Sequence, residues 1–194
     1  MIIYQDIDEP LDPPNCRRLI RRILSEGSVR FSKVLNMKCM QCGSATETKS
    51  ETYLYDRGGI RATLVNVPVH RCAACGDFEV EIPLIAQLNQ ALADALIRQP
   101  SRLTGAEIRF LRKALGWSGV DFARHMGVDA ATVSRWETGQ RMGASAERLL
   151  RLAVSVGTRA QDYSLDHLAT DLSETTEHVP MRFECADDAW RLVA

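Results

Sequence analysis

The amino-acid sequence predicts an α+β protein, with a small N-terminal β module, a linking helix and a C-terminal all-α domain. Residues 37–80 contain two Cys-x-x-Cys-Gly motifs that flank a strand-like alternation of apolar residues. Residues 81–100 and 101–157 instead carry apolar residues at helical spacing. The chain has 194 residues, of which 45% are hydrophobic, so two small cores fit its length.

An N-terminal extension, residues 1–36, precedes the β module. It begins as a polar segment broken by proline and continues as a basic helix candidate that should stop at Gly27. A basic amphipathic helix can contact nucleic acid or a partner protein. Packing on a neighbouring element, with the arginines in solvent, explains the same pattern, and we favour packing.

Four cysteines make up the motifs MKCMQCG and HRCAACG. A Cys-x-x-Cys turn brings two sulfurs to one side, and two such turns supply the four thiolates of a tetrahedral zinc site. Four thiolates leave no open coordination position, so the zinc would be structural. Iron in a rubredoxin-like site is compatible with the spacing, whereas buried free thiols and a thioredoxin-type redox pair fit it poorly. The predicted metal ligands are Cys39, Cys42, Cys72 and Cys75.

Strands are expected at residues 51–55, 61–70 and 78–80, and the turn residues 56–59 join the first two. Because so small a sheet buries little apolar surface, the metal should contribute folding free energy. The zinc-binding β module therefore spans residues 37–80. The linking helix, residues 81–100, follows with its apolar stripe at Ile85, Leu88, Leu92 and Leu96, and Pro100 marks the next boundary.

Residues 101–157 are expected to form a helical domain. Thr104 and Glu107 make a capping box for its first helix. Two sets of apolar residues are predicted to face its core: Ile108, Leu111 and Leu115 from the first helix, and Leu149, Leu152 and Val156 from the last.

Within this domain, residues 117–141 predict two short helices around a tight turn. Ser118 with Asp121 caps the first helix, Gly127 supplies the turn, and Asp129 caps the second helix, which ends at Gly139. Val133 and Trp136 should point inward, leaving small side chains and one arginine outside. That arrangement suits a recognition helix in the DNA major groove. The predicted DNA-binding residues are Ser118, Ala130, Ala131, Thr132, Ser134, Arg135, Thr138 and Arg141.

Charge distribution favours nucleic acid as the ligand of the helical domain. Residues 101–157 contain nine basic and five acidic residues, although the whole chain has a net charge of −1. Residues 158–194 form an acidic tail with a net charge of −5, whose last part predicts a β-hairpin, MRFEC and AWRLV. A solvated linker and packed hairpin are favoured over mimicry of DNA charge.

Several function classes are disfavoured. No stretch approaches the length of an apolar membrane span, and the acidic start is unlike a signal peptide, so a cytoplasmic protein without membrane association is expected. No group of residues has the spacing of a catalytic site, so we expect no enzyme activity.

The spacing of Ala123, Gly127, Val133, Trp136, Glu137 and Gly139 resembles the Xre/Cro-type repressors, whose five-helix domain would run from about Leu103 to Val156. The chain also resembles the MqsA family of toxin-antitoxin antitoxins, with a YgiT-type zinc finger. The residues that carry this resemblance are the two Cys-x-x-Cys-Gly motifs and the segments VNVPVHRC and SRWETG. This resemblance covers residue 37 to about residue 157.

The resemblance implies a structural zinc, a homodimer, binding to a palindromic operator in double-stranded DNA, repression of the protein's own operon, and a small RNase toxin bound by the N-terminal module. Arg135 matches the arginine with which the family reads a base. Ala131 replaces the family's asparagine, so the operator sequence cannot be transferred. The extension and the acidic tail also depart from the family pattern.

The favoured function is therefore a zinc-stabilised dimeric repressor that acts as an antitoxin. Two alternatives stay open: a stand-alone Xre-type regulator without a toxin, and a rubredoxin-like electron-transfer protein with an incidental helix-turn-helix.

Overall fold

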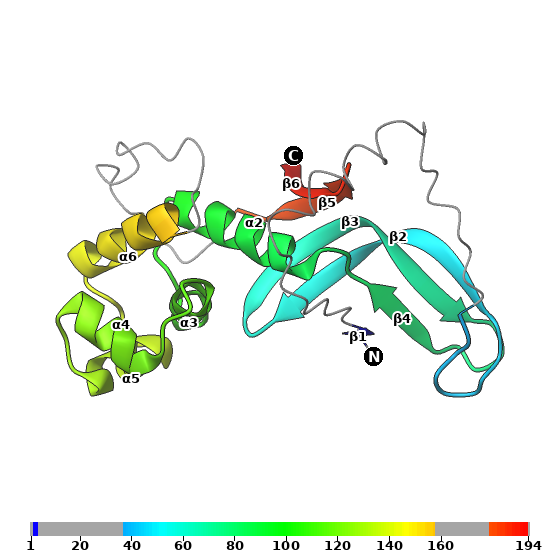
Figure 1. The fold of residues 1–194 in the computed structure, drawn as a ribbon, viewed down its shortest axis with the longest axis horizontal. Helices are drawn as coiled ribbons and strands as arrows, with labels where there is room; N and C mark the ends of the chain where they lie inside the picture. The colour runs from blue at the N-terminus through cyan, green and yellow to red at the C-terminus, as the bar shows by residue number, and fades with distance from the viewer. Residues whose placement is uncertain (1, 4–36, 158–178, 194) are drawn as a thin grey trace, which may run out of the picture. The chain divides into compact units, whose positions relative to one another are not determined.

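The computed structural model describes residues 2–3, 37–157 and 179–193, and within them it confirms the α+β class (Figure 1). Within these ranges, four strands precede five helices in the chain, and two further strands of the same sheet follow the last helix. The described residues divide into two compact units. Residues up to Lys49 join Pro68–Ile82 in the first unit, and Ser50–Val67 joins the residues from Pro83 onward in the second. The basic helix expected in residues 1–36 lies outside the described residues.

The first unit holds both cysteine motifs and one end of the sheet. Strand β3 (Ile60–Cys72) pairs there with β4 (Phe78–Glu81) in antiparallel orientation, and β1 (Ile2–Ile3) adds to β4 in parallel. The buried imidazole of His70 makes contacts with both neighbouring strands, 2.7 Å from Thr48 Oγ1 and 3.3 Å from Glu81 Oε2. The sheet end is thus fixed by side chains as well as by its backbone ladder.

Strand β2 (Thr46–Arg57) is longer than predicted. Its first five residues, Thr46–Ser50, are all polar, and most of their side chains are exposed. Such a segment shows no alternation between apolar and polar residues, so its pairing with β3 is not visible in the sequence. The Gly58–Gly59 turn joins the two strands, and both glycines have positive φ.

The second unit confirms the C-terminal hairpin, β5 (Arg182–Ala186) and β6 (Ala189–Val193). Its turn residues Asp187 and Asp188 both have positive φ, as a tight hairpin turn of this kind requires. Strand β5 pairs in parallel with β3, and Leu64 lies opposite Phe183. Trp190 is buried and donates from Nε1 to Pro83 O at 2.8 Å, just before α2 (Ile85–Arg98).

Four helices follow α2: α3 (Gly105–Ala114), α4 (Gly119–Met126), α5 (Ala130–Glu137) and α6 (Ala144–Gly157). The capping boxes predicted for α3 and α4 are both present. The range expected to hold five helices thus holds four, and α2 packs on α3 and α6 as the fifth. None of the helices in the described part of the chain combines the length and apolar character needed to cross a bilayer.

The face of α6 that enters the core differs from the prediction. Leu149 and Val156 are 45% and 71% exposed, and Leu152 is half-buried, so the predicted inward stripe was wrong. Leu150 and Val154 are buried instead, and they share their face with Glu147 and Arg151. An apolar-stripe criterion fails here because two charged residues occupy core positions.

Those charged residues form a buried network with Arg102. Glu147 accepts from Arg102 Nε at 2.7 Å and from Arg151 Nη2 at 2.9 Å. The Arg151 guanidinium also donates to four backbone carbonyls at the end of α2 and in the segment after it: Leu96, Ile97, Gln99 and Ser101. The network therefore satisfies carbonyls that the end of α2 leaves without helical partners.

Candidate metal centre and nucleic-acid interface

The four cysteine sulfurs lie within 4.8 Å of one another. Cys39 Sγ is 3.6 Å from Cys75 Sγ, and Cys42 Sγ is 3.5 Å from Cys72 Sγ. Zinc–sulfur bonds of about 2.3 Å require sulfur–sulfur edges of about 3.8 Å in a tetrahedron, so the four thiols suit one central ion. A covalent disulfide of about 2.05 Å is excluded by these distances.

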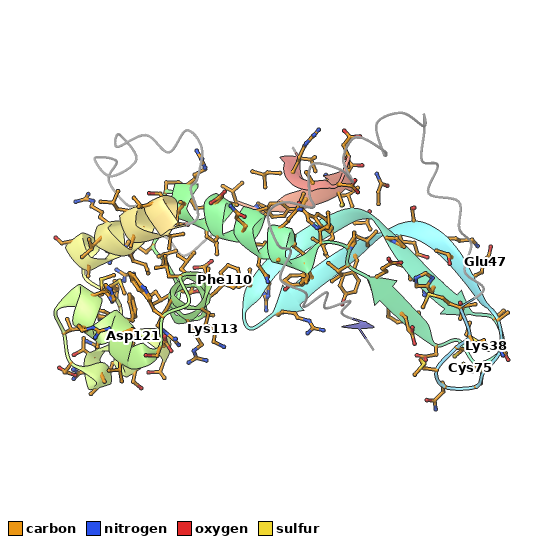
Figure 2. The ribbon with its side chains drawn as sticks, viewed as in Figure 1. Lys38, Glu47, Cys75, Phe110, Lys113 and Asp121 are labelled. Carbon is orange, nitrogen blue, oxygen red and sulfur yellow. The ribbon has the colours of Figure 1, made fainter. Side chains whose placement is uncertain are left out.

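The two motifs share one backbone arrangement. In the first, Gly43 N donates to Cys39 O at 2.8 Å and Cys39 N to Ser44 O at 2.8 Å; in the second, Gly76 N donates to Cys72 O at 3.0 Å and Cys72 N to Asp77 O at 2.9 Å. Both glycines have positive φ, which a residue without Cβ adopts at little cost. Figure 2 labels Cys75 in the loop of the second motif, beyond the end of β3.

Within the cluster, the pKa values of Cys42 and Cys75 are shifted in opposite directions. Hydrogen bonds from the side chain and backbone of Ser44 lower the pKa of Cys42 to about 6. The backbone N–H of Asp77 lowers the pKa of Cys75, but the neighbouring Cys42 sulfur and desolvation outweigh it and raise that pKa to about 12. Binding of a dication to all four sulfurs must therefore displace a proton from Cys75.

The helix-turn-helix is built by local caps. Asp121, labelled in Figure 2, accepts from Ser118 N at 3.1 Å, and Ser118 Oγ accepts from Asp121 N at 3.1 Å, so each closes the start of α4. Gly127 has a φ of 65° and ends α4. Asp129 Oδ1 then accepts from Thr132 N at 2.7 Å and starts α5.

Helix α5 ends in a Schellman arrangement. Gln140 N donates to Arg135 O at 2.8 Å and Gly139 N to Trp136 O at 3.3 Å, and Gly139 has a φ of 118°. Val133 and Trp136 are buried, as predicted. The cap at Asp129 and these C-terminal bonds fix the two ends of α5, and the burial of Val133 and Trp136 sets the direction of its outer face.

Each predicted DNA-contact residue lies outside the hydrophobic core. Thr132 is half-buried, and the others are exposed: Ser118, Ala130, Ala131, Ser134, Arg135, Thr138 and Arg141. Five of the eight residues come from the outer side of α5. Ser118 stands at the start of α4, Thr138 at the end of α5 and Arg141 in the loop after it. The outer side of α5 thus presents one long donor, Arg135, among small side chains.

Two arginines hold α5 against α3, and sequence analysis did not identify them. Glu137 accepts from Arg112 Nε at 2.6 Å and from Arg109 Nε at 3.1 Å. Burial raises the pKa of Glu137, but these hydrogen bonds and charges outweigh burial and leave the pKa below its ordinary value. The sequence did contain a signal for this contact: Arg109 and Arg112 are three residues apart, and this spacing places two side chains on one face of a helix.

Asp129, Thr132 and Arg135 form a line of contacts along α5. Thr132 Oγ1 donates to Asp129 Oδ2 at 3.0 Å, and Arg135 Nη2 donates to Thr132 Oγ1 at 2.7 Å. Hydrogen bonds from the backbone and side chain of Thr132 lower the pKa of Asp129. Asp129 is therefore an ionised acceptor at neutral pH.

A family model described as a helix-turn-helix domain matches residues 104–163. No curated protein and no solved structure matches the chain. Residues 104–163 thus carry a helix-turn-helix domain, the kind of domain with which transcription regulators bind DNA, and four cysteines cluster at metal-binding distance in the other unit.

Proposed function

We propose that the protein is a zinc-stabilised, dimeric, sequence-specific repressor, and that it acts as the antitoxin of a toxin-antitoxin pair and represses its own operon. The observation that carries the DNA-binding part is the outer face of α5, where Arg135 stands among Ala130, Ala131 and Ser134. Small side chains let a helix approach base edges, and arginine can donate two hydrogen bonds to guanine.

In this proposal Arg135 reads a base, and the exposed residues at the helix ends bind phosphates. Arg141 can offer a positive charge to the DNA backbone. Ser118 and Thr138 can each donate a hydroxyl to a phosphate in exchange for the bond that it donates within the domain, to Asp121 Oδ2 and to the carbonyls of Ser134 and Arg135 respectively. Lys113, exposed on α3, adds to the positive charge of the domain.

Arg135→Ala tests the assignment. Loss of a bidentate arginine–guanine contact should cost roughly 1–3 kcal/mol for the operator and much less for unrelated DNA. Arg124→Ala is the matched control, because it removes the same charge from α4, where Arg124 pairs with Asp121 at 2.8 Å. Gel-shift titrations at fixed salt provide both affinities. Equal losses on operator and random duplex would make Arg135 a phosphate contact and refute base reading.

The metal held by Cys39, Cys42, Cys72 and Cys75 is proposed to be zinc with a structural role. When bound, zinc supplies a cross-link between the two motifs and no open coordination position. The cysteine geometry accommodates iron as well, so elemental analysis of protein purified without chelator distinguishes the two. One zinc per chain supports the proposal, whereas one iron and a coloured protein favour the rubredoxin-like alternative.

The homodimer is proposed to form through the outer face of α6. Leu149, Leu152, Ala153 and Val156 recur at helical spacing on that face, and none of them is buried. A second copy is the proposed occupant, because a palindromic operator needs two recognition helices related by a two-fold axis, and one self-complementary apolar stripe supplies such an interface.

Leu149→Glu should convert the dimer to a monomer and weaken operator binding, because two charges would meet at the two-fold axis. Leu192→Glu is the matched control, since Leu192 is 60% exposed but lies on β6. Light scattering after size-exclusion chromatography measures the mass. A dimer that survives Leu149→Glu would place the interface elsewhere.

A toxin partner is proposed for the unit that contains the metal site. The helical domain has its own caps and core, so the cysteine motifs add nothing that groove binding needs. Strand β2 lies at a border of the described sheet, its first residues, 46–49, belong to that unit, and a border strand can pair with a strand of a partner.

Co-expression of the full chain with the product of the adjacent gene tests for this partner. Co-purification and relief of that product's growth inhibition support the antitoxin role. Failure of both, with zinc-loaded and DNA-binding protein, would favour a stand-alone regulator.

A further inference from the structure

Arg135 is not a solitary side chain on the face of α5. Its Nη2 donates to Thr132 Oγ1, and the Thr132 hydroxyl donates in turn to Asp129 Oδ2. The directions of both bonds follow from chemistry, because a guanidinium only donates and an ionised carboxylate only accepts. The hydroxyl proton is therefore committed to Asp129, and a lone pair of Thr132 Oγ1 faces the guanidinium.

This contact limits the freedom of an exposed arginine. A free arginine side chain carries about 2 kcal/mol of rotamer entropy, part of which is lost when it binds a base. A guanidinium already held at one nitrogen loses less on binding. Nη1, Nε and the second hydrogen of Nη2 stay available, so the contact with Thr132 leaves enough donors for a bidentate bond to guanine.

We propose that Thr132 is a positioning residue for base recognition: its hydroxyl, oriented by Asp129, holds Arg135 in the conformation that reads the base. This inference rests on the proposed role of Arg135 in reading a base. Asp129 has two functions in it, since Oδ1 caps α5 through Thr132 N while Oδ2 orients the hydroxyl.

Three variants of the full chain separate the hydroxyl from other effects. Thr132→Val keeps the β-branched shape and removes the hydroxyl, whereas Thr132→Ser keeps the hydroxyl. Asp129→Asn keeps a good helix cap but replaces Oδ2 with a group that can donate, which reverses the direction of the hydroxyl bond. Thermal melting checks that each variant is folded.

The readout is base preference. Sites are selected from randomised duplexes at fixed salt, and the position whose preference disappears in Arg135→Ala is identified. Affinities are then measured for the best site and for its single-base variant at that position. Thr132→Val and Asp129→Asn should each lower this preference about three- to tenfold, as loss of one solvent-exposed hydrogen bond of ordinary strength predicts, and Thr132→Ser should retain it.

A double-mutant cycle distinguishes positioning from direct contact. Thr132→Val lowers the affinity for the best site, and it should cause no further loss of that affinity when Arg135→Ala is already present. An equal loss in both backgrounds would mean that Thr132 contacts DNA itself and would overturn the inference, as would a Thr132→Val protein with unchanged preference. If Arg135→Ala leaves every base preference intact, the proposed base reading fails, and the inference fails with it.

The hydroxyl of Thr138 supplies a matched comparison. Thr138 Oγ1 donates to the carbonyls of Ser134 and Arg135 and does not contact the guanidinium in any described hydrogen bond. Thr138→Val should therefore weaken binding to all duplexes alike. A base-specific loss equal to that of Thr132→Val would contradict a special role for Thr132.

Discussion

Arg151 shows how a single buried charge can organise the core of the helical domain. Its side chain is 3% exposed, and it bonds Glu147 together with four backbone carbonyls. A buried charge that loses its partner is strongly destabilising, so removal of one member leaves other buried groups of the network unsatisfied.

Arg151→Met keeps most of the side-chain volume and removes all of these bonds. We expect a loss of about 3–5 kcal/mol in the free energy of unfolding, because buried carbonyls lose their donors and Glu147 loses one of its two arginines. Urea unfolding followed by circular dichroism measures the change. Arg124→Met is the control: its ion pair with Asp121 is exposed, so the loss should stay within about 1 kcal/mol. Similar small losses for both variants would contradict the role given to Arg151.

Glu137 should make stability depend on pH. Its two arginines hold the pKa of the folded state below the ordinary value of 4.5, which is the unfolded reference. Its contribution is therefore fully present above the unfolded pKa and is lost as the pH falls through the folded pKa. Glu137→Gln should cost about 1–2 kcal/mol at pH 7 and much less at an acid pH below the folded pKa, where the wild-type carboxyl is itself protonated. A destabilisation that is the same at both pH values would show that the charge of Glu137 is unimportant.

Residues whose effect is local were predictable from the sequence, whereas residues whose partners are distant were not. Ser118, Gly127 and Asp129 act on backbone groups a few positions away, so their spacing alone identifies the caps. Glu147 and Arg151 look like surface residues, because the carbonyls and arginine that satisfy them are some fifty positions earlier in the chain.

Among the elements, the hairpin of β5 and β6 was predictable but its place in the sheet was not. Alternating residues and two consecutive aspartates mark the hairpin itself. Its pairing with β3 joins segments far apart in sequence, and no local pattern encodes such a partner. The clustering of the four cysteines was predictable because each Cys-x-x-Cys-Gly motif fixes two cysteines and their turn together.

Removal of the metal should affect one unit selectively. With a chelator present, backbone amides of β4 and of the two cysteine motifs should lose protection from hydrogen exchange, because little apolar surface holds that unit together. Amides of α3 and α5 should remain protected by their own core. Exchange measured by mass spectrometry tests both statements, and equal loss of protection in the helices would mean that the two units unfold as one.

At the scale of the whole molecule, the contacts of α2 argue for a DNA-binding fragment that begins at residue 83. Arg151 binds carbonyls of Leu96 and Ile97, so fragment 101–157 would keep the arginine and lose those partners. We expect fragment 83–157 to unfold cooperatively, with a melting temperature well above that of fragment 101–157. Thermal melts at matched concentrations compare them. Equal melting temperatures would return the boundary to Pro100.

The parallel pairing of β3 with β5 also bears on how the protein is made. Thr63 lies opposite Arg182, so this part of the sheet cannot close until Arg182, more than a hundred positions later, has been synthesised. Until then the β3 edge that later receives β5 exposes unpaired N–H and C=O groups, which can capture strands of other nascent chains. Synthesis of Arg182–Glu184, which pair with β3, is therefore the step that ends this exposure, and ribosome pausing before codon 182 would prolong the interval of greatest aggregation risk.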